Sequence, residues 1–199
     1  IIPLLALIVN YSKTAATKEN KEPVFSVLIS FAFIVFGITN VLQIISSVSN
    51  LTPIVSLTNF EYSVRYGYMY SLILILIPFV YYLVPKIYGR EFTYGRLEAF
   101  NAYLLGISVV ATLSLNALIG INSGFSWNAG ANAGNPTIYG EGFLITWSLI
   151  STPYTLILFL SLLFLLSTFL FTLSTLKAII SGSVTESETV LEVPGDSYE

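Results

Sequence analysis

The sequence predicts an all-α fold, a polytopic bundle of transmembrane helices with four full spans and a partial span at the N-terminal end. Of the 199 residues, 55% are hydrophobic and only 10% are charged, which is too few charges to cover a water-soluble domain of this size. The apolar residues gather in long segments, and a helix needs about 20 of them to cross roughly 30 Å of hydrocarbon. Composition and segment length therefore place the chain in a lipid bilayer.

Four segments are long enough to span, and we expect them at 24–46, 67–85, 99–121 and 144–180, within a transmembrane domain of residues 1–181. The opening "IIPLLALIVN" is a partial span at 1–10, which we interpret as the tail of a helix whose beginning was processed off, lost or never numbered. "SLILILIPFVYYLV" is apolar on every side, unlike the alternating strands of a membrane barrel. Because a helix in a bilayer must satisfy its own backbone, we expect Pro78 to kink its span, and Pro85 and Gly89 to mark where it stops.

Seven of the eight basic residues fall on one side of this arrangement. The segments 11–23 and 86–97 and the end of the last span hold all seven, whereas 47–65 holds only Arg65 and 122–143 holds none. By the positive-inside rule, loops 11–23 and 86–97 and the C-terminus are cytoplasmic, and loops 47–65 and 122–143 are external to the cell membrane. The tail 182–199 has five carboxylates and no basic residue, so we expect a solvated acidic end.

The two expected external loops differ in character. The segment 122–143 is rich in Gly and Asn with a single proline, which predicts a turn-rich excursion. Asn50, in the tripeptide "NLT" of the other loop, is a candidate glycosylation site.

Residue types that are missing restrict the chemistry. The chain has no His and no Cys, and it has one Met, so the usual protein ligands for haem, copper, zinc and iron–sulfur clusters are nearly absent. Catalytic triads and dyads that need His or Cys are excluded for the same reason. No phosphate-binding loop and no basic, aromatic-rich face for nucleic acid is present. We expect no catalytic residue, no metal site and no cofactor bound by this chain, and no nucleic-acid partner.

Deep inside the spans the polar residues are amides and hydroxyls, notably Asn40, Asn101 and Asn116. One interpretation is that they join neighbouring helices by hydrogen bonds, at roughly 0.6–2 kcal/mol each. The alternative is that they line a polar conduction path.

One stretch of the chain resembles a known family. "YYLVPKIYGREF" (81–92) is similar to the end of the tenth helix and the following loop in subunit I of haem-copper oxygen reductases, of the cytochrome oxidase and nitric oxide reductase type. "LEAFNAYLLGISVV", "GINSGFSW" and "STPYTLILFLSLLFLL" then resemble the next helix, its turn and the last helix. The resemblance covers roughly residues 58–177 and implies a degenerate relative of the C-terminal part of that subunit.

In that family, the helix ending in the proline and "GR" signature begins with two haem-ligand histidines separated by one residue. The matching positions here are Tyr66 and Tyr68, so the resemblance implies that they do not act as ligands and that haem and copper belong to partner subunits. Tyrosines at this edge are also typical of an aromatic belt at the membrane surface, with or without a histidine-bearing ancestor.

Three functions remain open. The first is a non-catalytic accessory subunit of a respiratory terminal oxidase in an electron-transport chain, packed against haem-bearing integral-membrane subunits and lipids. The second is a small transporter or channel, and the third is one part of a split oxidase subunit I. The low charge and the abundance of Ile, Tyr, Ser and Thr indicate a prokaryotic, archaeal source.

Overall fold

The computed structural model describes residues 23–56, 58–89, 96–132 and 136–182, together with residues 6, 9, 10 and 13. Within these ranges the side chains at 23, 85, 127 and 129–150 are not described. The elements are the helices α2 (Pro23–Ser46), α3 (Thr52–Val55), α4 (Asn59–Tyr88), α5 (Arg96–Asn132) and α6 (Pro136–Ser181). The described part of the chain contains no strand, which confirms the all-α class. Most of the expected partial span at 1–10 and of the acidic tail 182–199 lies outside the described residues.

Four helices are long and apolar enough to cross a membrane. The candidate spans are Val24–Ser46, Asn59–Tyr88, Arg96–Ser126 and Ser151–Ser181. Each overlaps one of the four full spans expected from the sequence. The remaining described helix, α3, has four residues and is far too short to span.

The helices extend further than expected at the predicted external end. The expected loop 47–65 contains α3 and the start of α4, and the expected loop 122–143 is helical wherever it is described. An interior glycine costs a helix only about 1 kcal/mol relative to alanine, and Pro136 stands at the first position of α6, where proline is tolerated. The prediction of a turn-rich excursion at 122–143 is therefore wrong for the described residues.

Two of the expectations for α4 are confirmed: the helix does not end at Pro78, and Gly89 directly follows its end. The helix continues through Pro78, whose side chain is buried, and it ends at Tyr88. Gly89 follows with a φ of 61°, a left-handed conformation that glycine adopts without steric cost and that commonly ends a helix.

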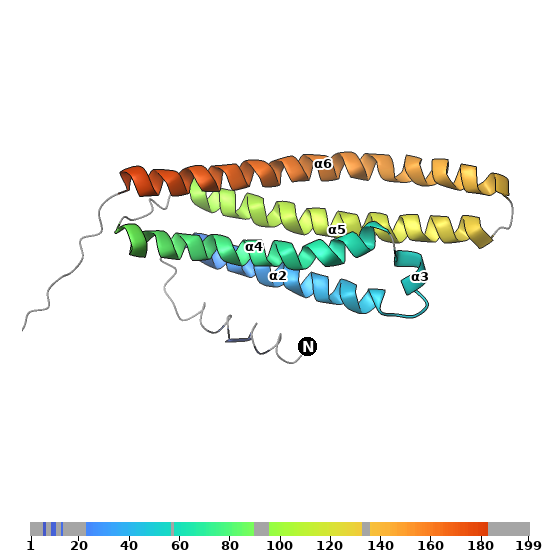
Figure 1. The fold of residues 1–199 in the computed structure, drawn as a ribbon, viewed down its shortest axis with the longest axis horizontal. Helices are drawn as coiled ribbons and strands as arrows, with labels where there is room; N and C mark the ends of the chain where they lie inside the picture. The colour runs from blue at the N-terminus through green and yellow to red at the C-terminus, as the bar shows by residue number, and fades with distance from the viewer. Residues whose placement is uncertain are drawn as a thin grey trace, which may run out of the picture.

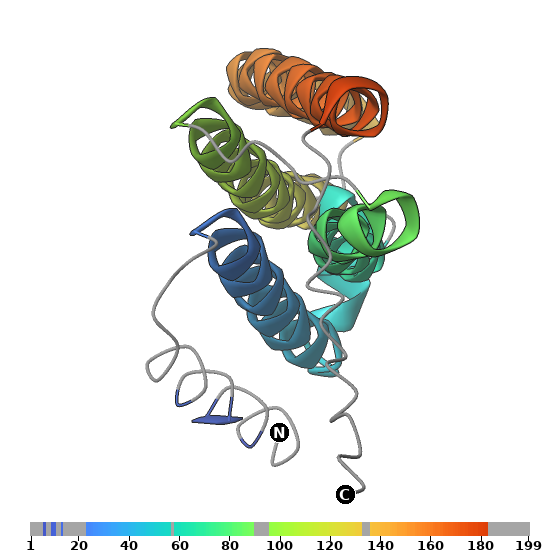
Figure 2. The ribbon, with the colours of Figure 1, turned by 90° about the vertical axis from the view of Figure 1, so that its left-hand side faces the viewer.

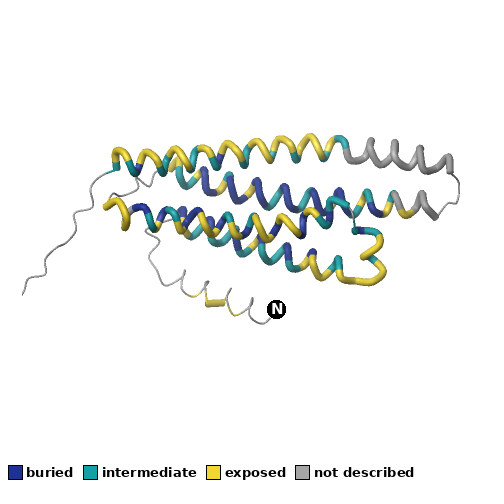
Figure 3. The backbone as a smooth tube through the Cα atoms, in the orientation of Figure 1, coloured by how far each residue is buried: buried dark blue, intermediate teal, exposed yellow. Residues whose placement is uncertain are grey.

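The four long helices alternate in direction and α5 lies at their centre. Figure 1 shows the long helices side by side, and in Figure 2 α2 and α6 lie on opposite sides of α5. α5 contacts each of the other helices α2, α3, α4 and α6. Within the most apolar stretch of the candidate span Arg96–Ser126, 56% of the residues are buried. Within the corresponding stretch of Ser151–Ser181, only 6% are buried. Figure 3 shows the same contrast, with buried residues concentrated along α5 and exposed ones along α6.

The alternation also groups charges at one end of the bundle. The start of α2, the end of α4, the start of α5 and the end of α6 lie together in Figure 1. Lys86, Arg96 and Lys177 belong to these helix ends, whereas Arg65 lies near the opposite end of α4. Among the basic residues of the described helices, three therefore lie at one end of the bundle and Arg65 lies near the other.

The apolar core joins α2, α4 and α5. Its most buried side chains leave at most 2% of their surface exposed and come from all three helices: Leu28, Val35, Phe60, Leu74, Val109 and Leu113. Among its described side chains, α6 adds one buried residue to this core, Ala178, and partly buried residues such as Phe164 and Phe171. The bundle is therefore a three-helix core with a fourth helix attached along α5.

Two glycines of α5 permit a backbone-to-backbone contact. Gly120 and Gly124, in "GINSG", have the small-xxx-small spacing that lets membrane helices approach closely. A Cβ added to Gly120 would lie 2.0 Å from the backbone nitrogen of Phe60, and one added to Gly124 would lie 2.1 Å from the carbonyl oxygen of Ile54. Only glycine fits at these positions, because backbone atoms cannot move away as a flexible side chain could.

We expect Gly120→Ala to lower the thermal stability of the purified chain. Overpacking typically costs about 1–3 kcal/mol, which exceeds the roughly 1 kcal/mol gained in helix propensity. The matched control is Gly37→Ala in α2, where an added Cβ meets nothing within 4 Å and stability should rise slightly. Thermal unfolding in detergent measures both, and equal stability of the two variants would contradict the packing of α4 against α5.

Candidate functional site

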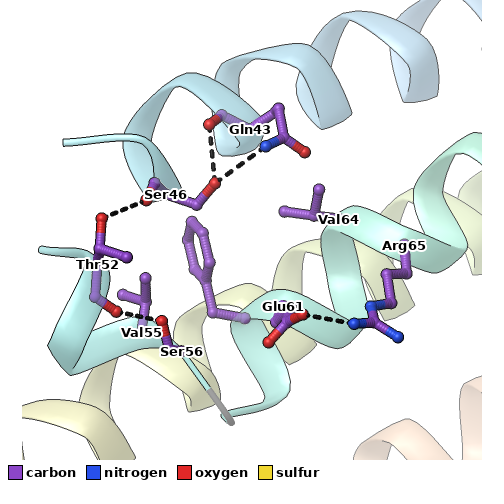
Figure 4. Close-up of a pocket in the computed structure, with 9 residues that line it drawn as sticks. Gln43, Ser46, Thr52, Val55, Ser56, Glu61, Val64 and Arg65 are labelled. Carbon is purple, nitrogen blue, oxygen red and sulfur yellow. Dashed lines mark hydrogen bonds and ion pairs between the residues drawn. The ribbon is translucent and has the colours of Figure 1, made fainter. Parts of the chain in front are cut away.

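A pocket of about 300 Å³ lies between α2, α3 and α4. Gln43 and Ser46 come from the last turn of α2, Thr52, Val55 and Ser56 from α3 and its C-terminal end, and Phe60, Glu61, Val64 and Arg65 from the start of α4. Figure 4 shows the labelled side chains coming from three segments, with the Arg65 guanidinium turned toward the Glu61 carboxylate. The floor is apolar, because Val55, Phe60 and Val64 are buried.

The rim of the pocket is polar and internally hydrogen-bonded. The Ser46 hydroxyl donates to the Gln43 carbonyl at 2.8 Å, and the Thr52 hydroxyl lies 2.8 Å from the Ser46 carbonyl. The Ser56 hydroxyl donates to the Thr52 carbonyl, as the dashed lines of Figure 4 show. Of these three bonds, the one from Thr52 joins α3 to the end of α2, whereas the other two hold the rim residues within each segment.

An ion pair completes one side of the pocket. Arg65 Nη2 donates to Glu61 Oε1 at 2.8 Å, one helical turn apart. The Arg65 side chain is 76% exposed and that of Glu61 is 41% exposed, so the pair contributes little to stability, typically 0–1 kcal/mol. The ion pair places one positive and one negative charge beside the pocket.

A buried polar contact attaches α6 to α5. Asn101 Nδ2 donates to the carbonyl of Ser167 at 3.1 Å. The Ser167 hydroxyl lies 2.6 Å from Asn101 Oδ1 and 3.0 Å from the Asn101 carbonyl. Ser167 is completely buried and Asn101 is 8% exposed, so the contact is shielded from the surroundings. The structure thus brings Asn101 into a bond between helices.

A second polar cluster joins α4, α5 and α6. Asn59 Nδ2 lies 3.4 Å from Asn116 Oδ1 and 2.5 Å from the Tyr154 hydroxyl. Asn116 Nδ2 in turn donates to the Thr112 carbonyl of its own helix at 2.9 Å. Nearby, the Ser63 hydroxyl of α4 lies 3.2 Å from the Leu113 carbonyl of α5. Asn116 therefore also takes part in contacts between helices.

The third predicted packing amide behaves differently. Asn40 Nδ2 donates to the Phe36 carbonyl of its own helix α2 at 2.7 Å, which is a bond within a helix and not between helices. The candidate glycosylation residue Asn50 is exposed in the turn between α2 and α3. In its tripeptide, the hydroxyl of Thr52 already donates to backbone carbonyls.

Tyr66 and Tyr68 lie on different sides of α4. Tyr66 belongs to an aromatic row with its neighbours one turn away, at ring centroid distances of 4.0 Å to Tyr62 and 6.5 Å to Tyr70. Tyr68 packs edge-on against Phe36 of α2 at 5.8 Å. These contacts account for both rings without a ligand, and two phenols do not fit the two-histidine donor set of the resembled family.

The row of Tyr62, Tyr66 and Tyr70 also reaches α6, where Tyr70 meets Phe164 edge-on at 5.8 Å. At 1.5 Å per residue the row covers about 12 Å along the helix. It runs along α4 and does not form a ring at a single depth.

Metal-ligating groups do not gather in the described part of the chain. No three His, Cys, Asp or Glu side chains among those residues lie close enough to hold a metal ion.

Sequence reasoning missed the partners of both amides. Ser167 is one of three hydroxyl residues in the otherwise apolar "LFLSLLFLLSTFLF", and such a residue could have indicated a helix contact. Asn59 fell outside the expected spans, whereas Tyr154 lay within the expected span 144–180 without being singled out. The pocket depends on how α3 folds back, which no local pattern indicates.

Comparisons of the chain with protein-family models, with curated proteins and with solved structures found no match.

We expect the Asn101 and Ser167 side chains to be energetically coupled. In a double-mutant cycle of Asn101→Ala and Ser167→Ala, the coupling energy should lie near 0.6–2 kcal/mol, the range for polar contacts between membrane helices. Unfolding in detergent with increasing denaturant measures the four free energies. The control cycle pairs Ser167→Ala with Asn40→Ala, which should be additive within about 0.5 kcal/mol. Additivity in both cycles would contradict the contact.

Proposed function

We propose that this chain is a non-catalytic integral-membrane subunit of a larger membrane complex, and that the complex is a respiratory terminal oxidase. The observation that carries the proposal is the exposure of α6. This helix packs along α5 and leaves its other sides to neighbours in the membrane. Among its exposed side chains are Leu158, Phe159, Leu162, Leu165 and Phe169. An apolar helix attached along one side suits a neighbouring subunit as well as lipid.

The buried polar groups support a structural role over a catalytic one. Asn101 and Asn116 hydrogen-bond to other helices or to the backbone, and their geometry is that of helix packing. The chain also has no His or Cys, so the common nucleophile–base and haem-ligand chemistries lack their residues. Function is then expected to lie in association with other subunits.

The oxidase assignment is supported by the resemblance of "YYLVPKIYGREF". In the structure, Tyr81 and Val84 of this stretch face the core, and Tyr81 packs edge-on against Phe171 of α6 at 5.1 Å. Tyr82 and Lys86 lie on the exposed side, where the Lys86 ammonium contacts the Tyr82 ring and hydroxyl. The proposal assigns the haem and copper to partner subunits and derives no chemical step in this chain.

Purification from the native membrane in mild detergent tests the proposal. The expected result is co-purification with integral-membrane subunits in fixed stoichiometry, together with a reduced-minus-oxidised haem spectrum that follows those subunits. Mass spectrometry and absorption spectroscopy are the measurements. A chain that purifies alone and colourless would contradict the proposal and favour the transporter alternative.

A matched pair of variants tests whether α6 is the docking helix. Leu165 of α6 is 67% exposed and Met69 of α4 is 60% exposed, so Trp at either position adds bulk outside the fold. We expect Leu165→Trp to reduce co-purification of partner subunits several-fold, by steric conflict at the interface, while Met69→Trp leaves it unchanged. Equal recovery of partners by both variants would exclude α6 as the docking surface.

A further inference from the structure

The pocket between α2, α3 and α4 has the position and size of a binding site for a membrane amphiphile. α2 ends at Ser46 and α4 begins at Asn59, so the pocket opens where two spans reach the end of their apolar stretches. Its volume of about 300 Å³ lies at the lower limit for sites that hold small molecules, which run from about 300 to 1,000 Å³. A lipid headgroup is present at this depth of a bilayer without any need for delivery.

The lining suits a molecule with an apolar and a polar part. Phe60 is fully buried on the floor, and Val55 and Val64 are 3% and 6% exposed. Above them the rim presents the Gln43 amide and the hydroxyls of Ser46, Thr52 and Ser56. Pockets with an apolar lining and a few placed polar groups are the common form of ligand site.

The charged pair sets the ligand class. An arginine has five N–H donors, and one of them, on Nη2, is donated to Glu61 Oε1, so the Arg65 guanidinium retains N–H groups for a phosphate oxygen. A carboxylate can accept about four hydrogen bonds, so Glu61 can serve an ammonium as well as Arg65. The two charges sum to zero, and a purely anionic headgroup would be repelled by Glu61.

We propose that this pocket binds the headgroup of a zwitterionic phospholipid with a primary ammonium, its phosphate on Arg65 and its ammonium on Glu61. Opposite charges in the ligand then face opposite charges in the protein, which is the arrangement that gives electrostatic specificity. A primary ammonium has three N–H donors, whereas a quaternary one has none, so phosphatidylethanolamine should be retained over phosphatidylcholine. The inference needs only a bilayer and is independent of any oxidase partner.

The test uses the full purified chain in nanodiscs of equal parts phosphatidylethanolamine, phosphatidylcholine and phosphatidylglycerol, followed by native mass spectrometry of retained lipid. The wild type should retain phosphatidylethanolamine over each of the others by about tenfold, the scale of one well-formed charged contact. Arg65→Gln should abolish that preference. Glu61→Gln should turn the preference toward phosphatidylglycerol, because an unopposed cation remains.

Two further variants separate the pocket from general surface charge. Lys86→Gln removes an exposed cation at the other end of α4 and should leave the lipid preference unchanged. Ser46→Leu fills the rim without changing charge and should reduce retention of phosphatidylethanolamine as strongly as Arg65→Gln does.

Several results would overturn the proposal. Equal retention of the three lipids by the wild type would remove it, and so would an unchanged preference in Arg65→Gln. Full retention in Ser46→Leu would place the effect on the surface and not in the pocket. Displacement of the lipid by free phosphoethanolamine at equal concentration would assign the site to a soluble ligand. None of these results bears on co-purification with other subunits, so the two proposals fail separately.

Discussion

The fold depends on the requirement that polar groups inside a bilayer find partners within the protein. Among the described helices, α5 has the largest share of the buried polar side chains. Its Asn101, Ser108, Thr112 and Asn116 recur at spacings of seven and four residues and so share one face. Asn101 meets α6 and Asn116 meets α4, whereas Ser108 donates to the carbonyl of Leu105 in its own helix. The polar face of the central helix thus contacts both α4 and α6.

The close approach of neighbouring segments to α5 at its glycines also holds the helices together. Hydrocarbon is as apolar as leucine, so membrane helices gain little from apolar burial alone and depend on packing and hydrogen bonds. Gly120 and Gly124 bring α5 against the backbone of the segment that holds α3 and the start of α4. Gly106 does the same for the Phe31 ring of α2. The pocket follows from this geometry, because α3 is held against α5 and leaves a space between α2 and α4.

Much of the fold could be predicted from the sequence because bilayer thickness imposes a length on each apolar segment. The four long apolar helices, the continuation of α4 through Pro78 and its end before Gly89 all follow from local rules. The helical part of 122–143 could not be predicted, because glycine and asparagine lower helix propensity only modestly and neighbouring turns decide the outcome. The partners of Asn101 and Asn116 could not be predicted either. They depend on the rotation of each helix about its axis, which an apolar segment with a weak polar pattern does not specify.

The most direct test of this account is thiol cross-linking in native membranes. The chain has no cysteine, so Asn101→Cys with Ser167→Cys introduces the only two thiols. Because the Ser167 hydroxyl lies 3.0 Å from the Asn101 carbonyl, the account predicts rapid cross-linking by a short bifunctional reagent. The control pair, Asn101→Cys with Leu165→Cys on the exposed side of α6, should react slowly. Faster cross-linking of the control pair would contradict the attachment of α6 to the polar face of α5.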